Sequence, residues 1–174
     1  SDPDGTVYDK LPRSFKRAVG NIASKLPAKR GVNFFVRKGK TVEERFIGNA
    51  YMFTPSERKS LLKIKTSAPD PMSITKPFYD NVKSKDDVTK MQYLDLHLWM
   101  AGDILLKADK MSMANSLELR VPFLDKEVMK VAERIPTKYR VTHDKSTEET
   151  KYITKYAMRL AAKKDTPKQT AQTA

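Results

Sequence analysis

The chain of 174 residues is 39% hydrophobic and 32% charged, which supplies enough apolar material for one globular domain and excludes a disordered chain. Its formal charge of +13 comes from 34 Lys and Arg against 21 Asp and Glu. Because the basic residues are dispersed along the sequence, we interpret most of them as a solvated face and expect no nucleic-acid partner. The absence of cysteine excludes disulfides, cysteine nucleophiles and cysteine-ligated metals. The sequence also has no signal-peptide pattern and no apolar run of about 20 residues, which predicts a soluble, cytoplasmic protein with no membrane partner.

The first fifty residues predict two helices joined by a loop. Apolar residues recur at helical spacing from Leu11 to Leu26, and Pro27 follows the last of them. The glycine-containing stretch 28–40 is predicted as a basic loop. A second helix is predicted from Thr41, with apolar side chains on one side at Val42, Phe46, Ile47 and Ala50.

Residues 54–57 predict the N-terminus of a helix. Thr54 can cap the helix, Pro55 suits the first helical position, and Glu57 completes a capping box. The stretch 66–77 that follows contains three prolines, so it is predicted as an extended connector.

Residues 86–116 follow a helical pattern almost throughout, with apolar residues recurring at three and four. Gly102 is predicted to divide this stretch into two helices, with Asp103 near the start of the second. Asp125 is predicted to cap the next helix, which should end before Pro136 and bury Val128, Met129, Val131, Ala132 and Ile135.

A second capping box, Ser146 with Glu149, predicts a final helix that runs to about Lys164. No alternating segment of useful length predicts a strand, so the expected fold class is all-α. We expect one domain piece over 1–174, with a helical and loop part at 1–80, a second helical part at 81–164, and a frayed tail at 165–174.

A row of cations is predicted on the final helix. Lys151, Lys155 and Arg159 are four residues apart, which would place them on one face opposite an apolar one. Such a row suits a polyanion such as a pyrophosphate, although a solvated basic face is the more ordinary explanation of the spacing.

The stretch 113–125 places Glu118 and Arg120 among apolar residues, so these charges either pair, face solvent or line a cleft. Asp103, Lys107, Asp109 and Lys110 form a charged cluster just before it, and Asp103 with Lys107 has the spacing of a helical ion pair. His97 and His143 belong to no metal-binding pattern, and no metal site is predicted.

Residues 93–125, "YLDLHLWMAGDILLKADKMSMANSLELRVPFLD", closely resemble a signature segment of the glutamine-dependent asparagine synthetases. The family pattern is D-x-L-x-K-x-D-[RK]-x-S-M-A-x-S-[LV]-E-x-R-x-P-F-L-D. It is matched at Asp103, Leu105, Lys107, Asp109, Ser112, Met113, Ala114, Ser116, Glu118, Arg120, Pro122, Phe123, Leu124 and Asp125. We call residues 93–125 the signature segment.

This resemblance implies a ligase that activates aspartate with ATP and Mg²⁺ to β-aspartyl-AMP, which ammonia from glutamine then converts to asparagine. The family's K-x-x-[LM]-R pattern falls on "KYAMR", so Lys155 is implied as the residue that stabilises charge on the phosphates, with Arg159 as its second cation. Glu118 is implied as the residue that orients or deprotonates the amine. Lys151, Arg120, Asp109 and Lys107 are further candidates for substrate and phosphate binding, and Asp125 is a structural cap.

The family's S-G-G-x-D-S and S-G-E-G-x-D-E loops and its glutaminase cysteine are absent from the sequence. The resemblance therefore implies the helical C-terminal portion of an α/β synthetase domain of the ATP-pyrophosphatase, adenine nucleotide alpha hydrolase-like type. We expect such a fragment to lack turnover and tightly bound cofactors by itself. Its expected partners are the missing synthetase core and the glutaminase domain, with a homodimer as one option.

Three alternative readings remain open from the sequence alone. One is a related β-lactam synthetase or peptide cyclase, because the residues that recognise aspartate are not identifiable here. A second is a basic helical nucleic-acid-binding module, which should concentrate its cations on one face. A third is a stand-alone scaffold that kept the fold and lost the chemistry.

Overall fold

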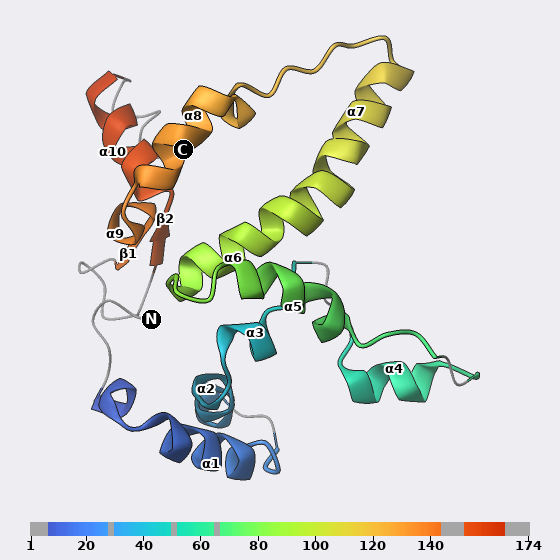
Figure 1. Cartoon of the computed structure of the whole chain (residues 1–174), viewed down its shortest axis with the longest axis vertical. Coiled ribbons are helices and arrows are strands. Elements are labelled where there is room, and N and C mark those ends of the chain that lie inside the picture. The colour runs from blue at the N-terminus through green and yellow to red at the C-terminus, as the bar shows by residue number, and fades with distance from the viewer. Residues whose placement is uncertain (1–6, 28–29, 50–51, 65–66, 144–151, 166–174) are drawn as a thin grey trace. The chain divides into compact units, whose positions relative to one another are not determined.

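The computed structural model describes residues 7–27, 30–49, 52–64, 67–143 and 152–165, and these are mostly helical (Figure 1). The chain divides into two compact units, Gly5–Leu119 and Arg120–Ala174, which are described separately below. Within the described ranges, no helix combines the length and the apolar content needed to cross a membrane. The prediction of an all-α chain is confirmed for most of the described residues, and two short strands are the exception.

The first unit contains only helices among its described residues. They are η1 (Val7–Lys10), α1 (Arg13–Ala23), α2 (Arg30–Gly39), α3 (Val42–Arg45), α4 (Pro55–Leu61), α5 (Pro71–Asn81), α6 (Asp87–Asp95), the π-helical η2 (Leu96–Ile104) and α7 (Leu105–Ala114). The described part of the second unit contains η3 (Pro122–Leu124), α8 (Lys126–Arg134), α9 (Thr137–Arg140), β1 (Val141–His143), β2 (Tyr152–Thr154) and α10 (Tyr156–Asp165).

Two helices begin at the capping residues that the sequence predicted. Thr54 caps α4, and both hydrogen bonds of the capping box with Glu57 are present. Asp125 caps α8 by accepting from the Glu127 backbone N–H at 2.8 Å. The helix from Thr41 has the same kind of box with Glu44, but it ends at Arg45, earlier than predicted.

The predicted loop over 28–40 was wrong, because α2 occupies most of it and packs against α1. The two helices cross where Gly20 and Gly39 meet backbone to backbone. A Cβ on Gly39 would lie 2.8 Å from the Lys16 carbonyl oxygen and 2.9 Å from Gly20 Cα. Gly39 therefore serves close helix packing, and tertiary contact outweighs the low helix propensity of glycine.

The predicted connector over 66–77 was wrong from Pro71 onward, where α5 begins. Asp70 caps the helix by accepting from the Met72 backbone N–H at 2.8 Å, and Pro71 occupies the favoured first position. Pro77 lies inside the helix and lacks its N–H donor. Thr75 and Tyr79 of the same helix are buried, and this burial offsets the cost of Pro77.

The long helical prediction for residues 86–116 is confirmed, but the break at Gly102 was wrong. α6, η2 and α7 continue into one another as a single rod in Figure 1, and Gly102 lies inside the π-helical stretch. The rod ends in a Schellman motif. Leu117 N–H donates to the Ser112 carbonyl and Ser116 N–H to the Met113 carbonyl, with Ser116 left-handed at φ 56°.

The core of the first unit is small and joins α3, α5 and α6. Val42, Tyr79 and Leu94 are buried, with Leu94 fully so, and Phe46, Phe78, Met91 and Leu98 pack around them. The Tyr79 hydroxyl donates to the Phe46 carbonyl oxygen at 2.5 Å, which satisfies its polar end. His97 packs its ring against Tyr93 and Phe78.

Tyr79 should make stability depend on pH in the alkaline range. Burial first, and then the nearby Glu43 and Asp95 carboxylates, raise its pKa from 10.0 to about 12. Because the folded-state pKa is raised, this stabilisation is complete below about pH 10 and is lost as the pH rises toward 12, to the extent of about 2 to 3 kcal/mol. In urea titrations at rising pH, the wild type should lose this free energy of unfolding and Tyr79→Phe should not. Equal losses in both proteins would contradict the assignment.

The second unit corrects the predicted final helix over 146–164. Residues 144–151, including the Ser146–Glu149 capping box, lie outside the described residues. Beyond them the chain forms β2, antiparallel to β1, with His143 opposite Tyr152, and α10 begins only at Tyr156. The absence of strands was therefore also predicted wrongly. In α8, Val128 and Val131 are exposed where burial was predicted, while Met129, Ala132 and Ile135 are half-buried.

Candidate functional site

The junction between β2 and α10 carries Lys155 and Arg159, the two cations of the K-x-x-[LM]-R pattern. Lys155 is the residue between the strand and the helix, and its backbone is left-handed with φ 55°. Its carbonyl oxygen accepts the first hydrogen bond of α10, from Arg159 N–H at 3.0 Å. A lysine costs more in this conformation than a glycine would, so the backbone at Lys155 is strained.

Arg159 is anchored beside the same turn. Its Nε donates to the Thr154 carbonyl oxygen at 3.0 Å, which ties the guanidinium to the last residue of β2. A guanidinium has five N–H donors, and this bond uses one of them. Lys155 and Arg159 therefore both belong to the turn that starts α10, where the first backbone N–H groups of a helix lack intrahelical acceptors and the helix dipole is positive.

This arrangement differs from the predicted row of three cations. Lys151 lies outside the described residues, and Lys155 precedes α10 rather than standing one turn before Arg159 within a helix. The prediction of a helical face was thus wrong. The two residues are joined instead through the backbone bond from Arg159 N–H to the Lys155 carbonyl oxygen, and Arg159 Nε is bonded to the Thr154 carbonyl oxygen.

The candidates in the first unit lie on α7 and on the extended stretch after it. Asp103 and Lys107 form the predicted ion pair at 2.5 Å. Asp109 is exposed on α7, and its carbonyl oxygen accepts from the Ser112 hydroxyl at 3.1 Å. Glu118 is exposed and follows the left-handed Ser116, whose turn takes the chain out of the helix.

The apolar neighbours of Glu118 and Arg120 are exposed, so the two charged side chains do not lie within a buried segment. Leu117, Leu119 and Val121 are 63%, 52% and 44% exposed. Arg120 is itself exposed and belongs to the second unit. Among the described residues, neither Glu118 nor Arg120 lines a pocket of its unit.

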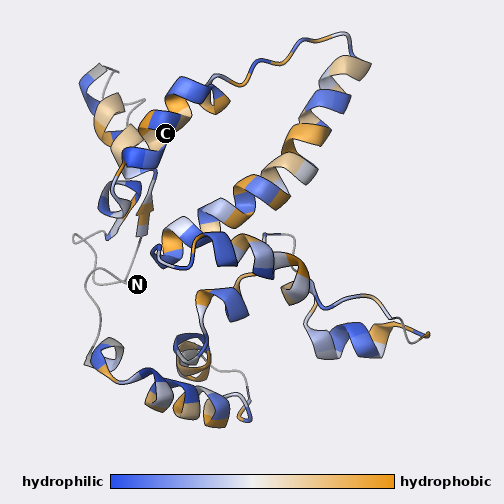
Figure 2. Ribbon diagram, in the orientation of Figure 1, coloured by the Kyte–Doolittle hydropathy of each residue, from blue (hydrophilic) through white to orange (hydrophobic). Residues whose placement is uncertain are grey.

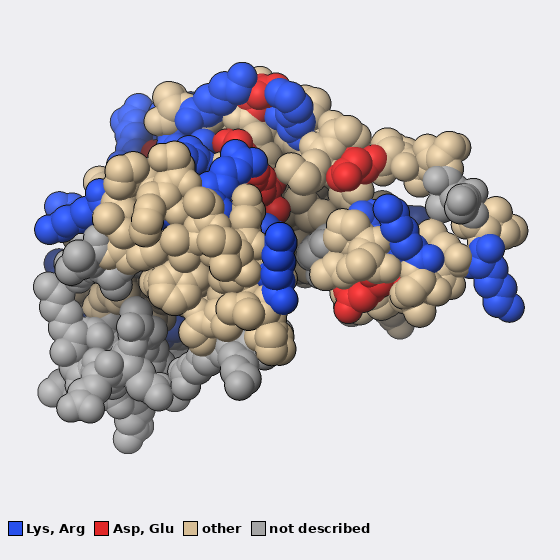
Figure 3. Space-filling view, turned by 90° about the horizontal axis from the view of Figure 1, so that it is seen from below, with Lys and Arg blue, Asp and Glu red and all other residues tan. Residues whose placement is uncertain are grey.

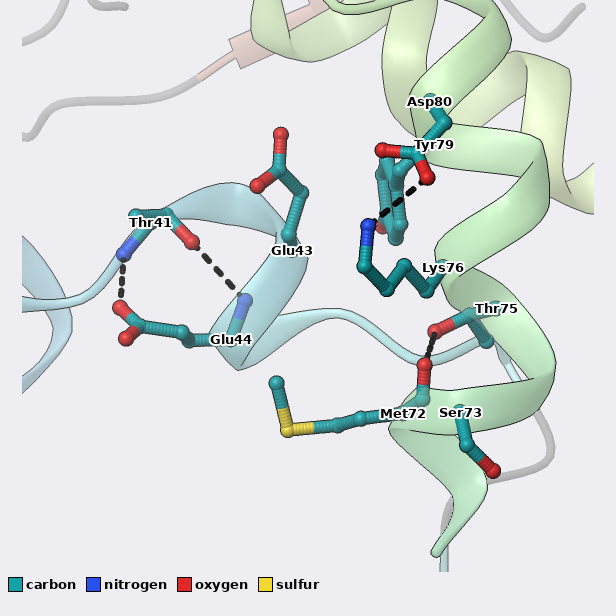
Figure 4. A pocket seen from close by; sticks show the side chains of 9 residues that line it. All are labelled: Thr41, Glu43, Glu44, Met72, Ser73, Thr75, Lys76, Tyr79 and Asp80. Atoms are coloured by element: carbon teal, nitrogen blue, oxygen red, sulfur yellow. Dashed lines mark hydrogen bonds and ion pairs between the residues drawn. The ribbon is translucent and has the colours of Figure 1, made fainter.

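A pocket of about 350 Å³ lies in the first unit, and sequence reasoning did not find it (Figure 4). It is lined by Thr41, Glu43, Glu44, Met72, Ser73, Thr75, Lys76, Tyr79 and Asp80. Its polar groups are engaged within the fold. The Thr41–Glu44 capping box forms one wall, and the Lys76 ammonium lies 2.8 Å from the Asp80 carboxylate on the other.

Hydrogen bonds from Lys76 and Lys83 lower the pKa of Asp80, which keeps this carboxylate ionised and paired. None of the predicted site residues lines the pocket. Of this lining, the sequence analysis had indicated only that a helix begins at Thr41. We therefore assign the pocket no role in the reaction.

Among the described residues, no group of three or more His, Asp or Glu side chains lies together in a way that could hold a metal ion by itself.

Comparison with known proteins identifies a family. The family model described as "Asparagine synthase" matches residues 10–170. Over 156 residues, 89% of this chain, the sequence is 42% identical to asparagine synthetase [glutamine-hydrolyzing] 1 of Bacillus subtilis (strain 168). It is 41% identical over 155 residues to proteins that carry the asparagine synthetase [glutamine-hydrolyzing] name in Mycobacterium bovis and Mycobacterium tuberculosis. No solved structure gives a significant match.

The matches cover 22% to 23% of the length of these relatives, so the chain spans less than a quarter of each. Their breadth along this chain confirms that the resemblance seen in the signature segment extends over most of its residues.

Proposed function

The chain belongs to the asparagine synthase family, and we propose that it is the helical part of an enzyme that makes asparagine from aspartate, ATP and glutamine-derived ammonia. Membership of the family supports the reaction class, a ligase of asparagine biosynthesis. The activity of the whole enzyme is part of the proposal, because the chain spans less than a quarter of its relatives. We expect the remaining parts, a nucleotide-binding core and a glutaminase domain, to be needed for turnover.

The role we assign to the start of α10 is to hold the phosphates of ATP and the departing pyrophosphate. The observation that carries this proposal is that Lys155 precedes the first turn of α10 while Arg159 is held to the Thr154 carbonyl oxygen, both at the positive end of the helix. Cations and helix N-termini both favour a polyanion, and charge that grows on a leaving pyrophosphate is stabilised by cations already held in position. The strained backbone at Lys155 is typical of a residue whose position serves function.

The remaining site residues have assignments that rest on the family resemblance. Glu118, which lies on the extended stretch after α7, orients or deprotonates the incoming amine. Arg120, Asp109, Lys107 and Lys151 are proposed as substrate and phosphate contacts. For Lys107, the ion pair with Asp103 offers a purely structural explanation as well.

Calorimetric titration of the chain with pyrophosphate and with MgATP tests the phosphate site. Lys155→Gly is the informative variant, because glycine adopts φ 55° without strain and removes only the cation. We expect it to weaken pyrophosphate binding at least about tenfold while the folded structure is retained.

Lys164→Gln is the matched control, since Lys164 is an exposed lysine in the last turn of the same helix. This control should bind pyrophosphate as the wild type does. The proposal would be contradicted by equal losses in both variants, or by no binding to a wild-type chain shown to be folded.

A further inference from the structure

The described part of the second unit contains no buried residue, so local contacts rather than a core hold its elements in place. Figure 2 shows hydrophobic residues interleaved with hydrophilic ones along α8 and α10. Lys and Arg occur in several separate places on the face shown in Figure 3, so charge alone does not distinguish Lys155 and Arg159 from other cations. What distinguishes these two residues is the backbone that carries them.

Strand β1 has a fixed starting point at the end of α9. The Val141 N–H donates to the Thr137 carbonyl oxygen, which closes the last turn of α9 at the first residue of the strand. The Arg140 guanidinium donates to the Thr137 hydroxyl at 3.0 Å within the same turn. Strand β1 is therefore the anchored partner of the two-stranded ladder.

The register of β2 on β1 determines where the two cations lie. Val141 pairs with Thr154, the residue before Lys155. The Thr154 carbonyl oxygen accepts from Arg159 Nε at 3.0 Å, and the Lys155 carbonyl oxygen accepts from Arg159 N–H at 3.0 Å. A slip of the ladder by one residue would turn the faces of β2 over and displace both cations.

A ring contact crosses this ladder between His143 and Tyr152. The two residues are directly opposite, with ring centroids 4.4 Å apart and ring planes inclined at 42°. Each strand has only three residues, and a short two-stranded ladder is marginally stable in water. Cross-strand contacts between rings stabilise such a ladder in one register, so this contact opposes slippage of β2.

We propose that His143 and Tyr152 are positioning residues for the phosphate site, because their ring contact holds β2 in the register that fixes Lys155 and Arg159. This inference rests on the function proposed for the start of α10. The two rings act through the backbone at Thr154 and Lys155. The left-handed backbone of Lys155 is unfavourable for a lysine, so it depends on the ladder that holds the residue before it.

Solvent exchange of the Arg159 Nε–H, followed by NMR in the isotope-labelled chain, tests the positioning without a ligand. Tyr152→Ala should speed this exchange at least about tenfold, because the bond to Thr154 opens when β2 is released. Tyr152→Phe keeps the ring and should restore the wild-type rate. The matched control is Tyr139→Ala, since Tyr139 on α9 is 42% exposed and Tyr152 is 44% exposed.

Calorimetric titration with pyrophosphate tests whether the positioning matters for the phosphate site. Tyr152→Ala should weaken binding at least about fivefold, because it displaces cations that must already be in position. In the Lys155→Gly background the same change should cost less than about twofold, because the two residues act as one unit. Circular dichroism verifies that each variant keeps its helices.

The inference is overturned if Tyr152→Ala leaves the exchange of the Arg159 Nε–H unchanged, or if Tyr139→Ala speeds it equally. It is also overturned if Tyr152→Ala costs the same pyrophosphate affinity with and without the Lys155 side chain, since a general loss of structure would do that. If the exchange responds as expected but the wild-type chain binds no pyrophosphate, the positioning by the ring contact stands and the phosphate role of α10 is contradicted instead.

Discussion

Replacing Leu94 with alanine is expected to lower the free energy of unfolding by about 3 to 5 kcal/mol. Leu94 is the fully buried side chain at the centre of the small core that joins α3, α5 and α6. Its truncation removes apolar burial and leaves a cavity beside Tyr79 and Val42, which the surrounding rings can fill only in part. Because a domain is stable by only about 5 to 15 kcal/mol, this loss should be visible directly in a urea titration followed by circular dichroism.

The comparison variant for this measurement is Leu61→Ala. Leu61 is 62% exposed on α4, so the same chemical change should cost less than about 1 kcal/mol there. A Leu94→Ala protein as stable as Leu61→Ala would show that the core does not depend on α6 in the way described.

Replacing Gly39 with alanine is expected to cost about 2 to 3 kcal/mol and to loosen the α1–α2 pair. The new Cβ would lie 2.8 Å from the Lys16 carbonyl oxygen and 2.9 Å from Gly20 Cα, and both atoms belong to the backbone of α1. A backbone cannot rotate away as a side chain can, so the two helices must separate. Thermal unfolding, together with amide hydrogen exchange of α1, measures the effect.

Gly31→Ala provides the control on the same helix. A Cβ on Gly31 meets nothing within 4 Å, so alanine should be neutral or stabilise α2 by up to about 1 kcal/mol through its higher helix propensity. If both substitutions stabilise the protein, the close crossing of α1 and α2 at Gly39 is not a feature of the fold.

Local chemistry allowed the helix starts to be predicted from the sequence. A capping side chain acts on backbone N–H groups two or three residues away, so Thr54 with Glu57 and Asp125 with its following turn could be read without knowledge of the fold. The continuous helical pattern of residues 86–116 was equally readable, because its periodicity is long.

Features that depend on distant contacts could not be predicted in the same way. Residues 28–40 look like a loop until Gly39 is placed against Gly20, and the prolines after residue 66 look like a connector until Thr75 and Tyr79 are buried. Nothing in the local sequence places a left-handed turn at Lys155, a residue that rarely adopts one. The pairing of β2 with β1, which fixes the start of α10, is likewise a contact between separated segments.

In the candidate site, too, the residues could be predicted from the sequence but their geometry could not. The identities of Lys155 and Arg159 were indicated by spacing and by the family resemblance, whereas their arrangement was not. The Arg159 bond to the Thr154 carbonyl is specific to the observed turn, and a continuous helix would have placed the two side chains differently.

If this chain is the helical part of an asparagine synthetase with Lys155 at the phosphates, it should function in place of the matching region of a relative. The most direct measurement exchanges the matched region of the Bacillus subtilis relative for this chain and assays glutamine-dependent asparagine formation. We expect the chimera to form asparagine, and we expect Lys155→Gln in the chimera to lower that rate at least about a hundredfold while glutamine hydrolysis continues. A chimera that hydrolyses glutamine but forms no asparagine, or full synthesis by the Lys155→Gln chimera, would contradict the claim.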